Sequence, residues 1–150
     1  MSKGKKDTIK NVFREGAIAP SFIAESIAKH QHKTNIGAHD IFLGQVRADE
    51  IDGKVVSGID YSAYEDMANE KFHEIKEDCF ETYDLSCLHI YHSKSFVPVG
   101  GICLFVFVSS AHRRVCFEAL EYLVERIKVE VPIFGKEMFE GDDFQWKTNK

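Results

Sequence analysis

The longest uninterrupted apolar run in the chain is Ile102–Val108. Its seven residues fall far short of the roughly 20 that a membrane-spanning helix needs. A strand that is apolar throughout belongs inside a sheet, where both of its faces are covered. The run therefore predicts a central strand in a protein that does not cross a membrane.

Two longer segments have the spacing of amphipathic helices, with apolar residues at steps of three and four and charged residues between them. The first spans 65–83 and the second spans about 111–130, where Val131-Pro132 ends it. A shorter helix is expected to begin at Pro20. The apolar stripes consist of Ala68, Phe72, Ile75, Cys79 and Tyr83 in the first helix and Cys116, Leu120, Leu123 and Ile127 in the second.

Strands are expected around these helices, at 9–16, 36–46, 55–64, 87–92 and within 133–146. Asp52-Gly53 is typical of a tight hairpin turn, so we expect the strands 36–46 and 55–64 on either side of it to pair. The pattern predicts an α+β domain over residues 9–150, with a mainly antiparallel sheet of about five to seven strands and about three helices. Residues 1–8 are basic and offer little to bury, which is typical of a flexible tail.

The charge balance and the missing motifs exclude several classes of function. Nineteen Lys and Arg against 24 Asp and Glu give a net charge of −5, which does not suit a protein that coats duplex nucleic acid. The four cysteines are separated by 8, 16 and 13 residues and the histidines share no metal-ligand spacing, so neither a zinc site nor a disulfide framework is expected. Serine-hydrolase, zinc-hydrolase and nucleotide-binding motifs are absent. With no signal-peptide segment, the expected location is the cytoplasm.

An unusual charge pattern lies where the central strand leads into the second long helix, in Ser109–Arg114. His112, Arg113 and a further arginine fall in the first turn, where the helix dipole disfavours cations. A phosphate or carboxylate bound by the backbone N–H groups and the guanidinium groups would remove this conflict. The alternative is that both arginines pair with acidic residues of the helix, such as Glu118 or Glu121, and that the histidine only packs.

Three further cations are candidates for a site, and each has an ordinary alternative. Lys128 lies in the last turn of the second long helix, where a lysine usually complements the helix C-terminus. Lys136 follows a glycine, which lets a ligand approach closely, but exposed loop lysines are common. Arg47 ends a strand and is an ordinary solvated strand end unless it converges on the other cations.

Taken in order along the chain, four motifs resemble one known family, the large, catalytic subunit of molybdopterin synthase. They are Phe42-x-Gly44-x-Val46-Arg47, Tyr61-x-x-Tyr64-Glu65-x-Met67-Ala68, Ser110-Ala111-His112-Arg113 and Val131-Pro132-Ile133-Phe134-x-Lys136-Glu137. The similarity runs from about Gly37 to Trp146. It implies an α+β domain of the α/β hammerhead type and a central homodimer with a small ubiquitin-like subunit at each end, which makes a heterotetramer.

The resemblance also implies an activity, a sulfur transfer in molybdenum cofactor biosynthesis. In this family a thiocarboxylate on the C-terminal Gly-Gly tail of the small subunit gives sulfur, in two rounds, to cyclic pyranopterin monophosphate, and the product is the dithiolene of molybdopterin. Neither a metal nor a nucleotide nor another cofactor is implied for this step.

Residue roles follow from the same resemblance. His112 and Arg113 would hold the phosphate of the substrate, and Arg47 would orient the substrate or stabilise negative charge. Lys128 would donate a proton or stabilise the oxyanion as sulfur leaves the acyl carbon.

Two positions depart from the family. Gly135 stands where the family commonly has a catalytic lysine, so either Lys136 acts from one position later, which is the expectation here, or another group performs the role. His92-Ser93 stands where the family often has His-Arg, and Lys94 is a possible substitute for the missing arginine. Two other functions therefore stay open, namely a non-catalytic module that binds an anion and a ubiquitin-like partner, and a homo-oligomeric structural domain whose basic residues only form ion pairs.

Overall fold

The computed structural model describes residues 9–148, so the basic tail predicted for residues 1–8 lies outside the described residues. Within this range the chain forms eight strands, three α-helices and one short 3-10 helix. None of the helices in the described range is long and apolar enough to cross a membrane. In chain order the elements are β1 (Phe13–Glu15), α1 (Pro20–His30), β2 (Ala38–Gln45), β3 (Glu50–Ile51), β4 (Lys54–Ala63), α2 (Glu65–Thr82), β5 (Cys87–Pro98), β6 (Ile102–Ser110), α3 (Arg113–Glu130), β7 (Ile133–Phe139), η1 (Glu140–Asp142) and β8 (Phe144–Trp146).

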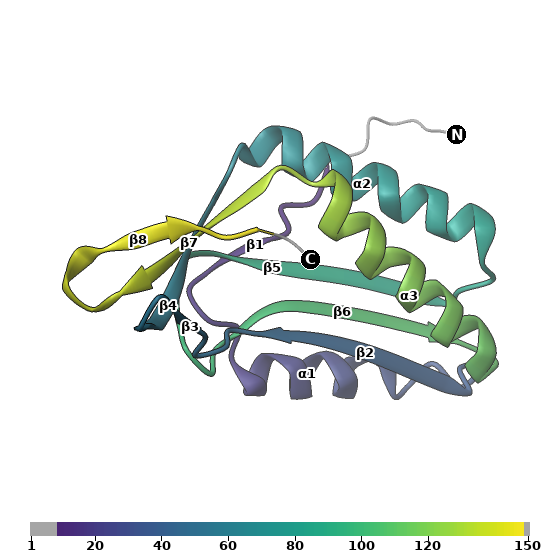
Figure 1. The fold of residues 1–150 in the computed structure, drawn as a ribbon. Helices are drawn as coiled ribbons and strands as arrows, with labels where there is room; N and C mark the ends of the chain where they lie inside the picture. Colours follow the sequence, from purple (N-terminus) through teal and green to yellow (C-terminus); the bar gives the residue numbers. More distant parts are fainter. Residues whose placement is uncertain (1–8, 149–150) are drawn as a thin grey trace.

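The strands form one sheet in the order β2-β6-β5-β4-β7-β8, with β1 added to β5 and β3 added to β4. Only the β1–β5 pairing is parallel among the strand pairs that the structure describes. β6 lies between β2 and β5, which confirms the central strand predicted from the apolar run (Figure 1). The predicted α+β class with a mainly antiparallel sheet is confirmed.

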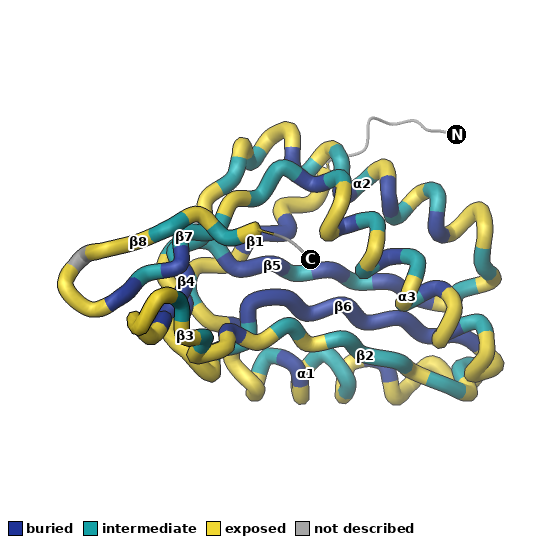
Figure 2. The backbone as a smooth tube through the Cα atoms, in the orientation of Figure 1, coloured by how far each residue is buried: buried dark blue, intermediate teal, exposed yellow. Residues whose placement is uncertain are grey.

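Helices cover both faces of this central part of the sheet, with α2 and α3 on one side and α1 on the other (Figure 1). Successive residues of β6 point to opposite faces. Leu104 and Val106 pack in the core beneath α2 and α3, whereas Phe105 and Phe107 pack against residues of α1. β6 is consequently the most continuously buried element in the tube view, as its sequence requires (Figure 2).

The predicted pairing of the strand at 36–46 with the strand at 55–64 is wrong. β2 pairs with β6, and Asp52-Gly53 instead joins the two-residue strand β3 to β4. The turn itself was identified correctly, because Asp52 and Gly53 have φ of 51° and 81°, the left-handed conformation that a tight hairpin turn needs. A turn sequence specifies the conformation of the residues next to it, but it does not encode the length of the strands that it joins.

The strand count was also underestimated, at five to seven against the eight of the described chain. β1, β3 and β8 have only two or three residues each. β1 falls within the strand expected at 9–16 and β8 falls within 133–146, but β3 was not expected, because two residues are too few to show an alternation of apolar and polar side chains. The two long helices and the shorter one at Pro20 were predicted correctly.

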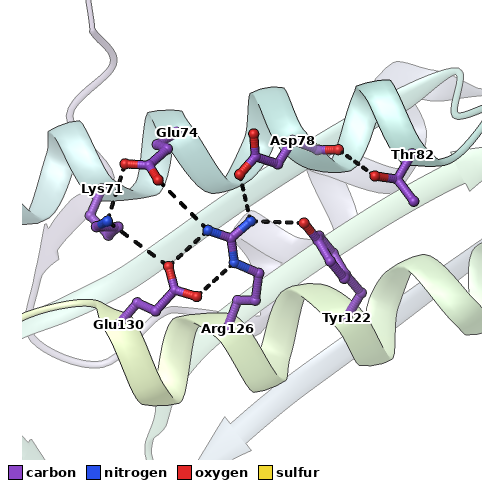
Figure 3. Close-up of polar contacts among 7 residues, drawn as sticks. All are labelled: Lys71, Glu74, Asp78, Thr82, Tyr122, Arg126 and Glu130. Carbon is purple, nitrogen blue, oxygen red and sulfur yellow. Dashed lines mark hydrogen bonds and ion pairs between the residues drawn. The ribbon is translucent and has the colours of Figure 1, made fainter.

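A network of ion pairs joins the outer sides of α2 and α3 (Figure 3). The Arg126 guanidinium donates two hydrogen bonds of 2.8 Å to the Glu130 carboxylate and one of 2.7 Å to Asp78 Oδ2. It also donates to the Tyr122 hydroxyl at 2.8 Å. Only 20% of the arginine side chain is exposed, so these bonds are better shielded from water than those of an ordinary surface pair.

We expect Arg126→Met to lower the free energy of unfolding by about 1–2 kcal/mol, because the substitution leaves Asp78 and Glu130 close together without their shared cation. Urea unfolding monitored by circular dichroism measures this loss. Lys54→Met is the matched control, since the pair of Lys54 with Asp143 is more than half exposed on both sides. That control is expected to cost less than about 1 kcal/mol; equal losses in the two variants would contradict the stabilising role of the network.

Candidate functional site

Two neighbouring cavities meet at the C-terminal end of α3. The inner one has a volume of about 170 Å³ and is lined by Tyr61, His92 and Gly135, among others. The outer one has a volume of about 660 Å³, and its lining includes Arg47 and Glu137. Lys128 and Lys147 line both cavities, so these two lysines form the boundary between them.

The fold places these lysines from two directions. Lys128 lies in the last turn of α3, whose buried residue Ile127 anchors the helix end in the core. Lys147 follows β8, and its backbone N–H donates a 2.8 Å hydrogen bond to the carbonyl of Gly135 in β7. The β7–β8 pairing therefore brings the C-terminal segment back to the end of α3, beside Lys128.

Burial changes the protonation of several groups in the inner cavity. Desolvation is the main cause that lowers the pKa of Lys128; Cys103 opposes the shift and the charge of Lys147 adds to it. The pKa of His92 falls to about 4, because burial outweighs the hydrogen bond of its Nδ1 to the Ser93 carbonyl. Burial likewise raises the pKa of Tyr61. At neutral pH the cavity thus presents an uncharged imidazole and a phenol beside two amines.

Arg47 lines the outer cavity together with both lysines, and its guanidinium pairs with Asp49 at 3.2 Å. Its side chain is 73% exposed, so it lies at the solvent side of that cavity. Lys94, the possible substitute for the missing arginine, instead lies 3.5 Å from a carboxylate oxygen of Glu65.

Lys136, by contrast, is not brought together with Lys128. Its register partner in β8 is Trp146, and its Nζ lies 4.7 Å from the ring centroid of Phe144 and 5.4 Å from that of Trp146. Neighbours in a strand point to opposite faces, so Lys136 points away from the cavities that Gly135 and Glu137 line.

Gly135 does not relax this constraint, because β7 keeps its register with β4 throughout Ile133–Met138. A Cβ atom at Gly135 would lie 2.9 Å from Ile59 Cγ2, which is too close for an ordinary contact. Ile59 thus narrows the space that a side chain at position 135 would occupy, where the family commonly has a lysine. Lys147 lies beside this position, because its backbone N–H donates to the Gly135 carbonyl and both residues line the inner cavity.

A separate cavity of about 370 Å³ lies at the N-terminal end of α3 and includes His112 and Arg113 in its lining. The helix begins without a side-chain cap and without an acidic residue in its first turn. Among residues 9–148, Arg113 makes no ion pair, so the predicted alternative of pairing with Glu118 or Glu121 is not found. Gly37 forms part of the wall, and a Cβ there would lie 2.2 Å from the Ala111 carbonyl oxygen.

The two sites lie at opposite ends of one helix. α3 contains 18 residues, which at a rise of about 1.5 Å per residue separates its ends by roughly 25 Å. Within one chain, therefore, the structure brings Arg47 together with Lys128, and His112 together with Arg113, but not the two pairs with each other.

Sequence reasoning missed Lys147 and Glu137 as members of the site. Both follow from the strand pairing near the C-terminus, since Gln145 in β8 donates a 2.9 Å hydrogen bond to the buried Glu137 of β7. The only local signal was the glycine at 135, which marked a place of close approach without saying which residue would approach it.

A family model described as MoaE protein matches residues 18–130. The chain belongs to the MoaE protein family. The resemblance identified from the four motifs is thereby confirmed.

Relatives of this MoaE-family chain bear the name molybdopterin synthase catalytic subunit. The Drosophila willistoni protein is 40% identical over 116 residues, which cover 76% of this chain and 31% of that protein. The human protein is 34% identical over 114 residues, which cover 76% of this chain and 60% of that protein. This chain thus spans less than two thirds of the length of these curated relatives.

The fold is shared with solved structures. The molybdopterin synthase from Staphylococcus aureus superimposes with a TM-score of 0.80 at 29% identity, over 95% of this chain and all of that one. A complex of subunits 1 and 2 of molybdopterin-converting factor from Helicobacter pylori has a chain with TM-score 0.76 at 19% identity, covering 91% of this chain and 90% of that one.

The buried His92 predicts a pH dependence of stability. Its pKa is lowered from 6.5 to about 4 in the folded protein, so the unfolded chain takes up a proton first as the pH falls. The contribution of His92 to stability is therefore complete above about pH 6.5 and is lost as the pH falls towards 4. Urea midpoints measured from pH 7.5 to 4 are expected to fall less steeply in His92→Gln than in the wild type. Parallel curves would contradict the neutral, buried state of this imidazole.

Proposed function

We propose that this protein is the catalytic, sulfur-transferring subunit of a molybdopterin synthase. The observation that carries the proposal is the convergence of Arg47, Lys128 and Lys147 on two joined cavities in a chain of the MoaE family. A thiocarboxylate and a pterin phosphate are both anions, and cations at the edge of a partly dehydrated cavity attract and orient such groups.

In this proposal the C-terminal Gly-Gly tail of a small ubiquitin-like subunit carries its thiocarboxylate to Lys128 and Lys147. In each of two rounds, the thiocarboxylate sulfur forms a C–S bond at a carbon of cyclic pyranopterin monophosphate, and that carbon loses a C–O bond. Water then hydrolyses the acyl–sulfur bond, which leaves the sulfur on the pterin and the tail as a carboxylate. Burial lowers the pKa of Lys128, which eases the loss of a proton from its ammonium group and suits this residue to proton transfer in this step. Arg47 then orients the substrate or balances its negative charge.

In our proposal, Lys147 performs the role of the catalytic lysine that the family commonly has where this chain has Gly135. It lines the same two cavities as Lys128, whereas Lys136 packs on aromatic rings on the other face of β7. The earlier expectation for Lys136 and the present one for Lys147 make opposite predictions, so the same experiment distinguishes them.

His112 and Arg113 bind the phosphate of the pterin in this proposal, at the N-terminus of α3. These residues lie roughly 25 Å from Lys128 along the helix, so the phosphate-binding pair and Lys128 of one chain cannot contact the same substrate molecule. A second copy of the chain must supply one half of the site. This geometry supports the expected homodimer, which with two small subunits makes a heterotetramer.

The small partner is supported by the Helicobacter pylori neighbour, which was solved as a complex of the two subunits of molybdopterin-converting factor. We place the protein in the cytoplasm, as expected from the sequence. All four of its cysteines are free thiols, which suits a reducing compartment.

The activity is tested by mixing the protein with cyclic pyranopterin monophosphate and a thiocarboxylated small partner, and by omitting each component in turn. Dithiolene product is expected only when all three are present. A stable complex with the partner that yields no product would instead identify the protein as a non-catalytic binding module, and the absence of any complex would favour a structural domain.

Single variants in the same assay assign the amines. Lys128→Ala and Lys147→Ala are each expected to lower the rate of product formation by about a hundredfold or more, with partner binding retained. Lys136→Ala is the matched control, since it removes an amine of the same strand pair from the opposite face, and its rate is expected to stay within about threefold of the wild type. A collapse of the rate in Lys136→Ala alone would return the catalytic role to that residue.

A mixing experiment tests the shared site. Arg113→Ala and Lys128→Ala are each expected to be inactive alone. After the two variants are unfolded together and refolded, about half of the dimers contain one chain of each kind. Each mixed dimer has one intact site out of two, so about a quarter of the wild-type activity is expected to return. No recovery, with mixed dimers demonstrated, would show that the two ends of α3 do not act on one substrate.

A further inference from the structure

A cluster of metal-ligand side chains lies on the α1 face of the sheet, away from α3 and its two sites. It consists of His30, Cys87 and His89, whose ligand atoms all lie within 4.8 Å of one another. Among the residues that the structure describes, this is the one group of three or more such side chains so closely placed. None of the three residues takes part in the proposed sulfur transfer.

The fold brings the three ligands together from two elements. Cys87 and His89 are two residues apart on β5 and therefore point to the same face. His30 is the last residue of α1, which packs against that face through Phe22, Ile23 and Ile27. His30 and Cys87 are buried and His89 is partly buried.

We propose that His30, Cys87 and His89 bind a Zn²⁺ ion, or a divalent cation of similar softness, which fixes the end of α1 to the sheet. Two imidazole nitrogens and one thiolate are ligands that Zn²⁺ prefers, and three protein ligands leave the fourth tetrahedral position for water or another ligand.

The orientation of His30 matches that of a zinc ligand. Its Nδ1 lies 2.7 Å from the carbonyl oxygen of Ser26, which can only accept, so Nδ1 carries the proton and Nε2 presents a lone pair. A carbonyl that holds the second ring nitrogen in this way is a common support of metal-bound histidines. That lone pair points at His89, with a distance of 3.0 Å between the two Nε2 atoms.

The spacing of the two histidine nitrogens is close to that of a filled site, and Cys87 Sγ lies within 4.8 Å of the ligand nitrogen of each histidine. Zinc–nitrogen distances of about 2.0–2.1 Å in a tetrahedron put two ligating nitrogens about 3.3 Å apart, near the 3.0 Å between the two histidines. In place of the ion, one proton now lies between these nitrogens. Metal binding moves that proton to Nδ1 of His89 and releases the thiol proton of Cys87 to solvent.

The surroundings of the three groups contain both an aromatic ring and further cations. The ring of Phe107 lies 4.8 Å from that of His30 and 6.2 Å from that of His89. Burial is the main cause that lowers the pKa of His89, and the charges of nearby lysines add to it, so the three ligands must hold a bound cation against these charges. Lys33, an exposed residue, donates a 3.0 Å hydrogen bond to Cys87 Sγ. Its flexible side chain can turn away to solvent when a metal takes its place.

The test is cobalt and zinc binding by the full chain, purified without a histidine tag. One equivalent of Co²⁺ is expected to produce the near-ultraviolet absorption of a thiolate–cobalt bond, and one equivalent of Zn²⁺ to remove it. Cys87→Ser is expected to abolish the absorption, and His89→Gln to weaken Zn²⁺ binding at least tenfold in competition with a chromophoric chelator.

Two variants serve as matched controls and are expected to leave binding unchanged. His32→Gln alters an exposed histidine two residues from His30, and Cys103→Ser alters a cysteine with the same 6% exposure as Cys87. If Cys87→Ser does not fold, His89→Gln and His30→Gln carry the test. No stoichiometric binding by the wild type, or equal binding by the ligand variants and the controls, would overturn the proposal.

Discussion

The burial of β6 on both faces is the constraint on which the rest of this structure depends. Its alternating side chains all avoid water, so the sheet needs an apolar cover on each side. α2 and α3 provide one cover and α1 provides the other. Because α3 must lie along the strands to cover them, its two ends lie near the two ends of the sheet. Both candidate sites for anions are consequences of this arrangement, one at each end of the helix.

The two ends of α3 are chemically different for a simple reason. At the N-terminus, backbone N–H groups lack partners and the helix dipole is positive, which supports the phosphate site that we propose at His112 and Arg113. At the C-terminus, two lysines meet beside His92, and burial keeps the imidazole neutral and lowers the pKa of Lys128. One end is thus suited to holding an anion and the other to moving a proton. The length of the helix keeps them apart in one chain, which is why the proposed function requires two copies.

Polar groups gather on both sides of the same sheet, but they differ in kind. On the side of α3, amines and a guanidinium surround two joined cavities, as expected for anionic ligands. On the side of α1, two imidazoles and a thiol lie close together and are the ligand set that we propose for a metal cation. The sheet separates the two groups, so loss of the proposed metal binding need not abolish the proposed sulfur transfer, and either proposal can be tested without the other.

The sequence by itself determined the main elements and the positions of candidate site residues. The apolar run fixed the central strand, the three-and-four spacing fixed the helices, and the first-turn cations at His112 and Arg113 marked a candidate anion site, because each of these signals lies within a few neighbouring residues. Only the tertiary structure decided which strand pairs with β2, that Lys147 rather than Lys136 adjoins Lys128, and that His30 meets Cys87 and His89. These contacts join residues that are far apart in the chain, and they depend on sheet order and strand register, which no local spacing encodes.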